Sequence, residues 1–211
     1  MEGVKTRYPE VDKITKGVAT IQTFSVDAER AREFNFRLLL GGGRGFQAIS
    51  AGDYVKLSVE GQLMMSDTPF EKRTNIEFLK NARGRVMIAG LGIGLILNAL
   101  KEKVESGEVT SIIVYEKYQD VIDLVADRYS DLPLEVRCED ILTYKPKKEE
   151  KYDTIYFDIW PNVTEDNLPE IAILHQRWKT HKEKGGWMDS WMSRYLRNER
   201  KASQRESRYW I

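Results

Sequence analysis

Three glycines interrupt the most apolar stretch of the chain, VMIAGLGIGLILNAL (86–100), at positions 90, 92 and 94. Inside a helix or strand, glycine is less favourable than alanine by about 0.5–1 kcal/mol, so a buried element gains nothing from it. Between a strand and a helix, glycines instead allow a tight turn, and the first N–H groups of the helix stay available to a ligand. We therefore interpret Gly90, Gly92 and Gly94 as a ligand-binding loop. The alternative is a turn that only packs a strand against a helix.

Acidic residues follow three of the predicted strands. Glu116 and Asp158 each come directly after a short apolar run, and Asp140 follows the strand predicted over 134–137. Glu139 is a neighbour that could take the role of Asp140. Ligands of open α/β sheets bind beyond the carboxyl ends of the strands, so we expect these acids to share an edge with the glycine loop. Each acid also has a plainer interpretation, as a surface residue, a turn or a cap.

The elements that must position these residues alternate along residues 76–211. Short apolar strands separated by helices predict a parallel sheet that is covered on both faces. The predicted strands are 85–89, 111–115, 134–137, 154–157 and 187–192, and the predicted helices are 95–104, 119–129 and 169–182. We expect the last of these helices to stop at Gly185–Gly186.

Residues 1–75 have a different pattern and predict an N-terminal β-hairpin and helix extension. A strand is expected over 18–24, a helix over 27–40, and a hairpin over 54–65 that turns at Glu60–Gly61. Thr74 and Glu77 have the spacing of a capping box, which predicts the start of a helix. The sequence therefore divides into this extension and a second domain over 76–211.

The ligand is indicated by the spacing of the glycines. The dinucleotide fingerprint is G-x-G-x-x-G, whereas this chain has G-x-G-x-G with Leu95 at the third fingerprint position, which disfavours NAD. The loop together with Glu116, over about residues 54–192, resembles the class I S-adenosylmethionine-dependent methyltransferases and the related spermidine synthases. The resemblance implies a Rossmann-like, doubly wound, mostly parallel α/β sheet with S-adenosylmethionine as the cofactor.

The resemblance also implies a role for each candidate residue. Gly90, Gly92 and Gly94 would hold the cofactor, and Glu116 would accept its ribose hydroxyls. Asp140, or Glu139 in its place, would recognise the adenine amino group. Asp158 would be the catalytic residue that faces the reacting centre.

Two related activities stay open at this point. Asp158 matches the first acid of the D-S-S-D-P-like segment of spermidine synthases, and their N-terminal hairpin is similar to residues 54–65. However, Ile93 stands where their glycine loop has an aspartate, and Trp160 and Pro161 replace the rest of that segment. We therefore expect a methyltransferase of the spermidine-synthase-like type. The alternatives are an aminopropyltransferase that uses decarboxylated S-adenosylmethionine, and a non-catalytic module that binds the cofactor or a nucleic acid.

Composition sets limits on partners and location. Lysine plus arginine and aspartate plus glutamate both total 33, so net charge indicates no partner, and the single cysteine, Cys138, excludes an intramolecular disulfide. Two histidines six residues apart, His175 and His181, do not share a helix face, so no metal site is expected. No apolar run is long enough for a membrane helix, so we expect a cytoplasmic protein that does not bind a membrane. We expect its acceptor to be a small molecule.

The C-terminal stretch 192–211 is the remaining candidate for binding. It has two acids, Glu199 and Glu206, and six basic residues: Arg194, Arg197, Arg200, Lys201, Arg205 and Arg208. The plain interpretation is a charged, solvated helix, and the alternative is contact with nucleic-acid phosphates. A last strand would be short (RYWI, 208–211), which makes a homodimer one way to close the acceptor side.

Overall fold

Five parallel strands form the central sheet of the molecule. The computed structural model describes residues 6–8, 11–41 and 45–206. The sheet order is β7-β6-β5-β8-β9, and every neighbouring pair is parallel. The strands are β5 (Gly84–Ala89), β6 (Val109–Glu116), β7 (Leu134–Cys138), β8 (Tyr152–Phe157) and β9 (Lys182–Ser190). The α/β fold class with a parallel sheet is therefore confirmed.

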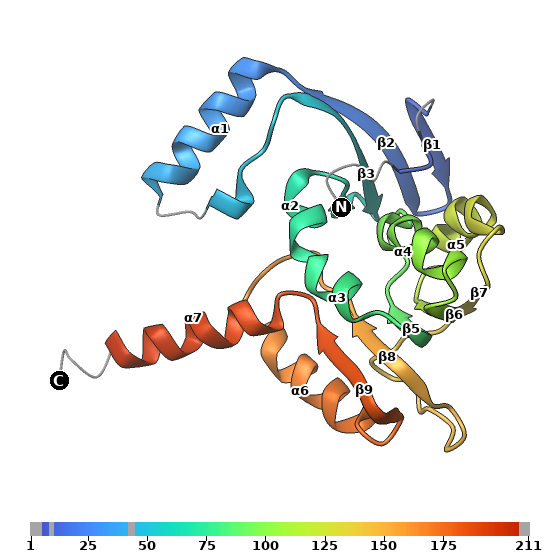
Figure 1. Ribbon diagram of the computed structural model, residues 1–211. Helices are drawn as coiled ribbons and strands as arrows, with labels where there is room; N and C mark the ends of the chain where they lie inside the picture. Colours follow the sequence, from blue (N-terminus) through green and yellow to red (C-terminus); the bar gives the residue numbers. More distant parts are fainter. Residues whose placement is uncertain (1–5, 9–10, 42–44, 207–211) are drawn as a thin grey trace.

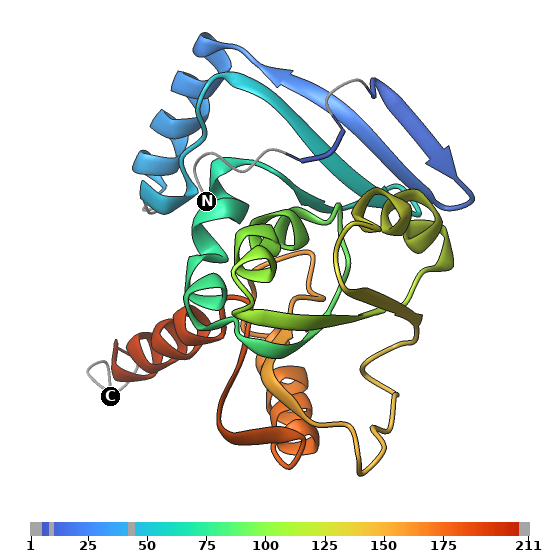
Figure 2. The same cartoon turned by 45° about the vertical axis from the view of Figure 1, so that its right-hand side comes forward.

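Helices cover both faces of this sheet because its strands are apolar on both sides. Val86 and Ile88 of β5 pack into one core with α4 (Leu95–Glu105), α5 (Gln119–Val125) and the short helix η2 (Ala126–Tyr129). Met87 and Ala89, which alternate with them, pack into a second core with α6 (Asn167–Trp178). Figures 1 and 2 show α4 and α5 on one side of the sheet and α6 on the other. This arrangement is doubly wound, as predicted.

A second, antiparallel sheet precedes the central one. Its order is β1-β2-β3-β4, with β1 (Lys13–Lys16), β2 (Ala19–Val26), β3 (Gly52–Val59) and β4 (Gln62–Ser66). The predicted hairpin is thus present as β3 and β4. Between β2 and β3 the chain forms α1 (Ala28–Leu40) and the short helix η1 (Gly45–Gln47), and α1 begins where the Asp27 side chain accepts a hydrogen bond from the Arg30 N–H.

The two sheets share one core. Ile21, Leu57 and Val59 of the antiparallel sheet belong to the same buried cluster as Val86 and Ile88 of the central sheet. Figure 2 shows β2 and β3 lying over the region of α4 and α5. The division of the chain near residue 75 stays a prediction.

Two short helices connect the sheets; the helix predicted after Thr74 is present, but Thr74 does not cap it. α2 spans Pro69–Thr74 and α3 spans Ile76–Asn81. Thr74 was expected to cap a helix with Glu77, but its hydroxyl donates to the Phe70 carbonyl oxygen within α2 (3.1 Å). The reason is that Pro69, which favours the first position of a helix, starts α2 five residues earlier and leaves Thr74 inside it.

The end of α6 also differs from the prediction. The helix stops at Trp178, and Gly185–Gly186 lie inside β9 rather than after the helix. A Cβ on Gly186 would lie 2.6 Å from the Asp153 carbonyl oxygen, so glycine allows β8 and β9 to approach closely where their register shifts. After β9 the chain forms α7 (Ser193–Glu206). The expected last strand, 208–211, lies outside the described residues.

Candidate functional site

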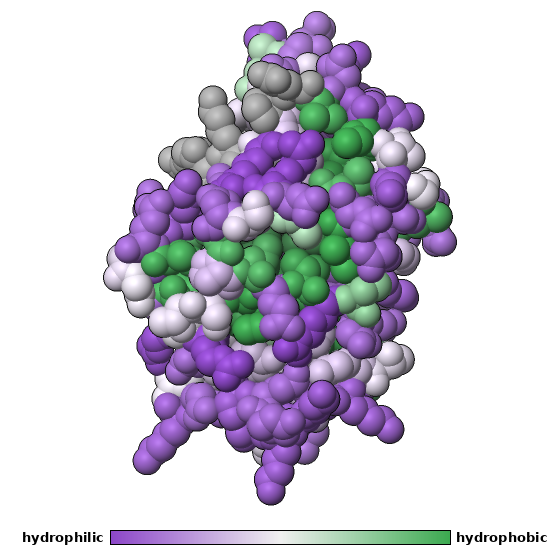
Figure 3. Space-filling view, turned by 90° about the vertical axis from the view of Figure 1, so that its right-hand side faces the viewer, coloured by the Kyte–Doolittle hydropathy of each residue, from purple (hydrophilic) through white to green (hydrophobic). Residues whose placement is uncertain are grey.

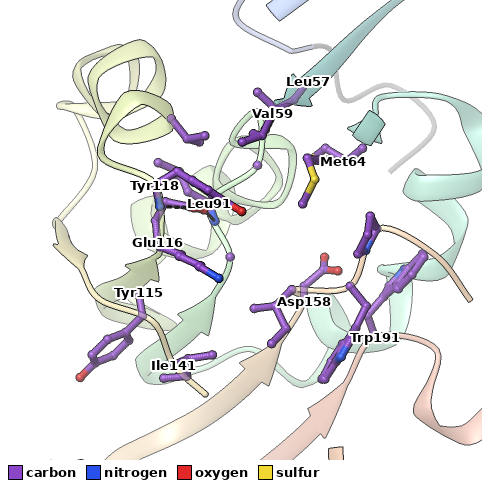
Figure 4. A pocket seen from close by; sticks show the side chains of 18 of the residues that line it. Leu57, Val59, Met64, Leu91, Tyr115, Glu116, Tyr118, Ile141, Asp158 and Trp191 are labelled. Carbon is purple, nitrogen blue, oxygen red and sulfur yellow. Dashed lines mark hydrogen bonds between the residues drawn. The ribbon is translucent and has the colours of Figure 1, made fainter. Parts of the chain in front are cut away.

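A cavity of about 200 Å³ lies at the carboxyl ends of β5, β6 and β8. A single buried water needs only about 10–15 Å³ on this measure, so the cavity has room for a ligand. It lies where the strand order changes direction, because β6 and β7 extend from β5 to one side and β8 and β9 to the other. The hairpin supplies apolar cover through Leu57, Val59 and Met64 (Figure 4). On the side of the molecule at the right of Figure 1, a hydrophobic area is enclosed by hydrophilic side chains (Figure 3).

The glycine loop lies between β5 and α4 and forms part of the cavity wall. Gly90 and Gly92 line the cavity, whereas Gly94 is not among its lining residues. All three have positive φ angles, 97°, 53° and 73° in order, and residues other than glycine rarely adopt such a backbone conformation. The loop is therefore built on a backbone that needs glycine at each of the three positions.

Each glycine also admits a close neighbour from another part of the chain. A Cβ on Gly90 would collide with the Asp158 carbonyl oxygen, and one on Gly92 would collide with the Met65 sulfur. A Cβ on Gly94 would collide with the Tyr129 ring, whose hydroxyl donates to the Ile93 carbonyl oxygen (3.0 Å). Packing thus accounts for Gly94, while Gly90 and Gly92 serve both packing and the cavity. Their role toward a cofactor stays a prediction.

Glu116 holds the loops on either side of it in place. One carboxylate oxygen, Oε2, accepts a hydrogen bond from the Leu91 N–H, and the other, Oε1, accepts one from the Tyr118 N–H (2.9 Å each). The side chain is buried and lines the cavity. Burial raises the pKa of Glu116, and these backbone hydrogen bonds oppose the rise. Because a carboxylate has about four lone-pair positions, it can accept further hydrogen bonds from a ligand.

Asp140 and Glu139 lie on the same wall, after β7. The Asp140 Oδ1 atom accepts a hydrogen bond from the Leu142 N–H (2.9 Å), so the residue forms a turn. Its Oδ2 atom lies 3.5 Å from the Lys117 ammonium group. Glu139 is exposed and also lines the cavity. The turn interpretation of Asp140 is therefore correct, and its second oxygen leaves the ligand-binding interpretation open.

A pair of carboxyl groups lies on the other side of the cavity. Asp158 follows β8, and Glu71 lies on α2; both are half-buried and line the cavity. Figure 4 shows Asp158 and Glu116 on opposite walls. Among the residues that the structure describes, neither Asp158 nor Glu71 has a hydrogen-bond or ion-pair partner for its carboxyl group. Polar groups that are withdrawn from water normally have such a partner, so these two are available to a ligand.

The surroundings raise the pKa of both carboxyl groups into the range of neutral pH. Burial raises the pKa of Asp158 to about 7. Burial, together with the nearby charge of Asp158, raises the pKa of Glu71 to about 8. Groups with pKa values close to the working pH are suited to accept or donate a proton. Sequence reasoning missed Glu71, because an acid in the first turn of a helix is a common stabilising feature and gives no separate signal.

Other polar groups on this wall are satisfied by the protein itself. The Trp191 Nε1–H donates to the Thr74 hydroxyl (2.9 Å), and the Asn75 amide donates to the Glu71 carbonyl oxygen (3.0 Å). The Asn75 side-chain oxygen accepts from the Tyr156 hydroxyl (2.9 Å). These bonds fix the positions of α2 and the end of β9, and they occupy the polar atoms of Asn75 and Trp191.

The cavity is acidic. Among the described residues, it is lined by one basic side chain, Lys117, and five acidic ones: Glu71, Glu116, Glu139, Asp140 and Asp158. Such a lining favours a ligand that carries positive charge when its carboxyl groups are ionised, which for Asp158 and Glu71 requires a pH above about 7 and about 8.

The two histidines and the cysteine lie outside this site. The His175 Nε2 atom bonds with the Ser190 hydroxyl (2.9 Å), and the His181 Nδ1 atom bonds with the Glu150 carbonyl oxygen (2.7 Å). In the described part of the chain, no three His, Cys, Asp or Glu residues are grouped to hold a metal ion. Cys138 is exposed at the end of the edge strand β7. No helix in the described ranges has both the length and the apolar character to cross a membrane.

No family model matches this sequence, and no curated protein matches it. Among solved structures, a SAM-dependent methyltransferase from Leishmania major is 15% identical with a TM-score of 0.43, over 56% of this chain and 47% of that chain. An amino pentose methyltransferase from Micromonospora echinaspora, solved with SAM bound, is 15% identical with a TM-score of 0.37, over 56% of this chain and 45% of that chain.

A third match is not a methyltransferase. A lysine cyclodeaminase is 12% identical with a TM-score of 0.30, over 74% of this chain and 46% of that chain. This chain thus spans just under half the length of each of these three proteins. With TM-scores this low, the likeness extends only to the general α/β arrangement.

Proposed function

We propose that this protein binds S-adenosylmethionine in the cavity and transfers its methyl group to an acceptor. The observation that carries the proposal is the position of Glu116. Its buried carboxylate lies beside the glycine loop, at the switch point of the strand order, with acceptor positions left for two ligand hydroxyls. This acceptor fits an adenosine ligand, because the two oxygens of a carboxylate can accept hydrogen bonds from the two ribose hydroxyls.

The remaining walls fit the other parts of such a ligand. Leu91, Tyr118 and Ile141 provide apolar surface for a flat base on the Glu116 side of the cavity. Asp140 or Glu139 would accept a hydrogen bond from the exocyclic amino group. The acidic lining also favours the positive sulfonium.

Asp158 and Glu71 would serve the acceptor. The bound cofactor would supply a sulfonium methyl group, which is already an activated electrophile. The protein then needs to align the acceptor and to receive its proton when the new bond forms. With its pKa raised to about 7, the Asp158 carboxyl is suited to receive that proton. We expect turnover to rise with pH through about 7, and Asp158→Asn to lower it by roughly 10²–10⁴.

One observation favours a second candidate, transfer of an aminopropyl group from decarboxylated S-adenosylmethionine to an amine. The intact cofactor carries a carboxylate, and Lys117 is the single basic side chain among the described lining residues. The decarboxylated donor lacks that carboxylate and retains an ammonium group, which better suits a lining with more acidic than basic side chains. In this reaction the S–C bond to the propyl chain breaks, a C–N bond forms, methylthioadenosine leaves, and a carboxylate takes the proton from the amine.

Calorimetric titration with S-adenosylmethionine, its decarboxylated form and S-adenosylhomocysteine tests the proposal. We expect the first and third to bind, and Glu116→Ala to weaken both by at least tenfold. Glu105→Gln, a change at the exposed end of α4, is the matched control and should leave binding unchanged. Preference for the decarboxylated donor would favour aminopropyl transfer. Absence of binding by all three would refute both activities and favour a non-catalytic module.

The products then separate the two reactions. Wild-type protein is incubated with each donor and a pool of small amines, other small molecules and RNA. S-Adenosylhomocysteine formation supports methyl transfer, and methylthioadenosine formation supports aminopropyl transfer. Full activity of a folded Asp158→Asn protein would contradict the role given to that carboxyl group.

A further inference from the structure

We infer that helix α7 is a binding surface for the phosphate backbone of a nucleic acid. The chain as a whole is neutral, yet α7 contains five basic residues and two glutamates. Charge is therefore unevenly distributed, with an acidic cavity at one place and a basic helix at another. The inference goes beyond the proposed transfer reaction and does not depend on it.

The basic residues of α7 lie on one side of the helix. At 3.6 residues per turn, Arg194, Arg197, Lys201 and Arg205 lie within about 80° of one another around the axis, and Arg200 lies about 60° beyond Arg197 on the same side. Glu199 lies on the other side. We call the basic residues from Arg194 to Arg205 the basic stripe. At 1.5 Å per residue the stripe is roughly 16 Å long, which is enough to contact several phosphates along a nucleic-acid strand.

The stripe is accessible over most of its length. Tyr195 and Leu196, near the start of α7, pack into the core around α6, and beyond them the helix extends away from the body of the molecule (Figures 1 and 2). Arg200, Lys201 and Arg205 are exposed. No ion pair in the described part of the chain involves any of these three.

The composition of the second half of α7 indicates which kind of partner it would bind. Residues 197–205 (RNERKASQR) contain no large apolar side chain, so this part of α7 lacks the apolar face that a membrane surface or a helical protein partner would bind. Exposed arginines and a lysine on one face instead match the regular negative charge of a phosphate backbone. Because α7 begins two residues after Trp191, which lines the cavity, a strand bound there lies close to the site.

Fluorescence anisotropy tests this surface with a labelled single-stranded RNA of about 20 nucleotides and a DNA duplex of similar length, without cofactor. We expect binding that weakens with KCl between about 50 and 200 mM, because neutralised phosphates release counterions. The triple variant Arg200→Gln/Lys201→Gln/Arg205→Gln should bind at least tenfold more weakly. Its slope of log affinity against log salt should be smaller by about 2 for the single strand.

A matched control removes the same charge elsewhere. Lys145→Gln/Lys147→Gln/Lys148→Gln changes three exposed lysines in the loop between β7 and β8 and should leave binding unchanged. Circular dichroism checks that both variants are folded. The inference is overturned if neither nucleic acid binds at about 50 mM KCl, if both triple variants weaken binding equally, or if polyglutamate competes as well as RNA at equal charge. The last result would indicate that α7 binds an acidic protein instead of a nucleic acid.

Discussion

Replacing Asp158 with asparagine should change how the stability of the protein depends on pH. Burial raises the pKa of this carboxyl group from 3.8 to about 7, so the folded protein holds the proton more tightly than the unfolded chain does. The stabilisation from this group is complete below about pH 4 and is lost as the pH rises through about 7. Asparagine has a similar shape and cannot ionise, so the variant does not have this loss.

The size of the effect follows from the pKa. Each pKa unit corresponds to about 1.4 kcal/mol, so ionising Asp158 in the folded state lowers the free energy of unfolding by up to about 4 kcal/mol. Of this, about 2–3 kcal/mol falls between about pH 5 and about pH 8. We therefore expect the free energy of unfolding of Asp158→Asn, relative to wild type, to increase by at least that amount over this range, because removing the charge of Asp158 also lowers the pKa of Glu71.

Urea unfolding of both proteins at the two pH values measures the difference. Asp127→Asn, which changes an exposed aspartate after α5, is the control and should follow the wild type within about 0.5 kcal/mol. If Asp158→Asn and the wild type change in parallel with pH, the carboxyl group is hydrated in the folded protein. The argument that it is suited to take a proton from an acceptor would then be refuted.

Three further changes test other parts of the site. Glu116→Gln should weaken S-adenosylmethionine binding less than Glu116→Ala in calorimetry, because it keeps the shape and one acceptor; equal affinities would remove the residue from the ligand site. Gly94→Ala should lower the free energy of unfolding by more than Gly107→Ala, since both have positive φ but only Gly94 has an aromatic ring in the way. That excess should be about 1–3 kcal/mol, and equal losses would contradict the packing argument. Gly92→Ala should displace Met65 and reduce the rise in melting temperature on adding S-adenosylmethionine, whereas an unchanged rise would show that the loop does not contact the ligand.

The sequence alone predicted the order of most elements because their signals are local. Short apolar runs such as 85–89 and 111–115 lie between helical patterns, and the parallel sheet follows from that alternation. Asp27 before α1 and the turn at Glu60–Gly61 are likewise readable from a few neighbouring residues. A local signal fails where the same residue type serves two purposes. Gly185–Gly186 fits a helix end, but only the packing of β9 against β8 shows that Gly186 allows two strands to approach.

The candidate site shows the same division. The sequence placed Gly90, Glu116 and Asp158 at one edge of a sheet, because in a parallel sheet every strand ends at the same side. It could not place Glu71, which lies 87 positions before Asp158 and reaches the cavity only because α2 docks beside the end of β8. Nor could it show that the two carboxyl groups have no partner among the described residues, or that their pKa values are raised to about 7 and about 8. Burial and the absence of a partner depend on every element that packs around a group, so only the tertiary structure decides them.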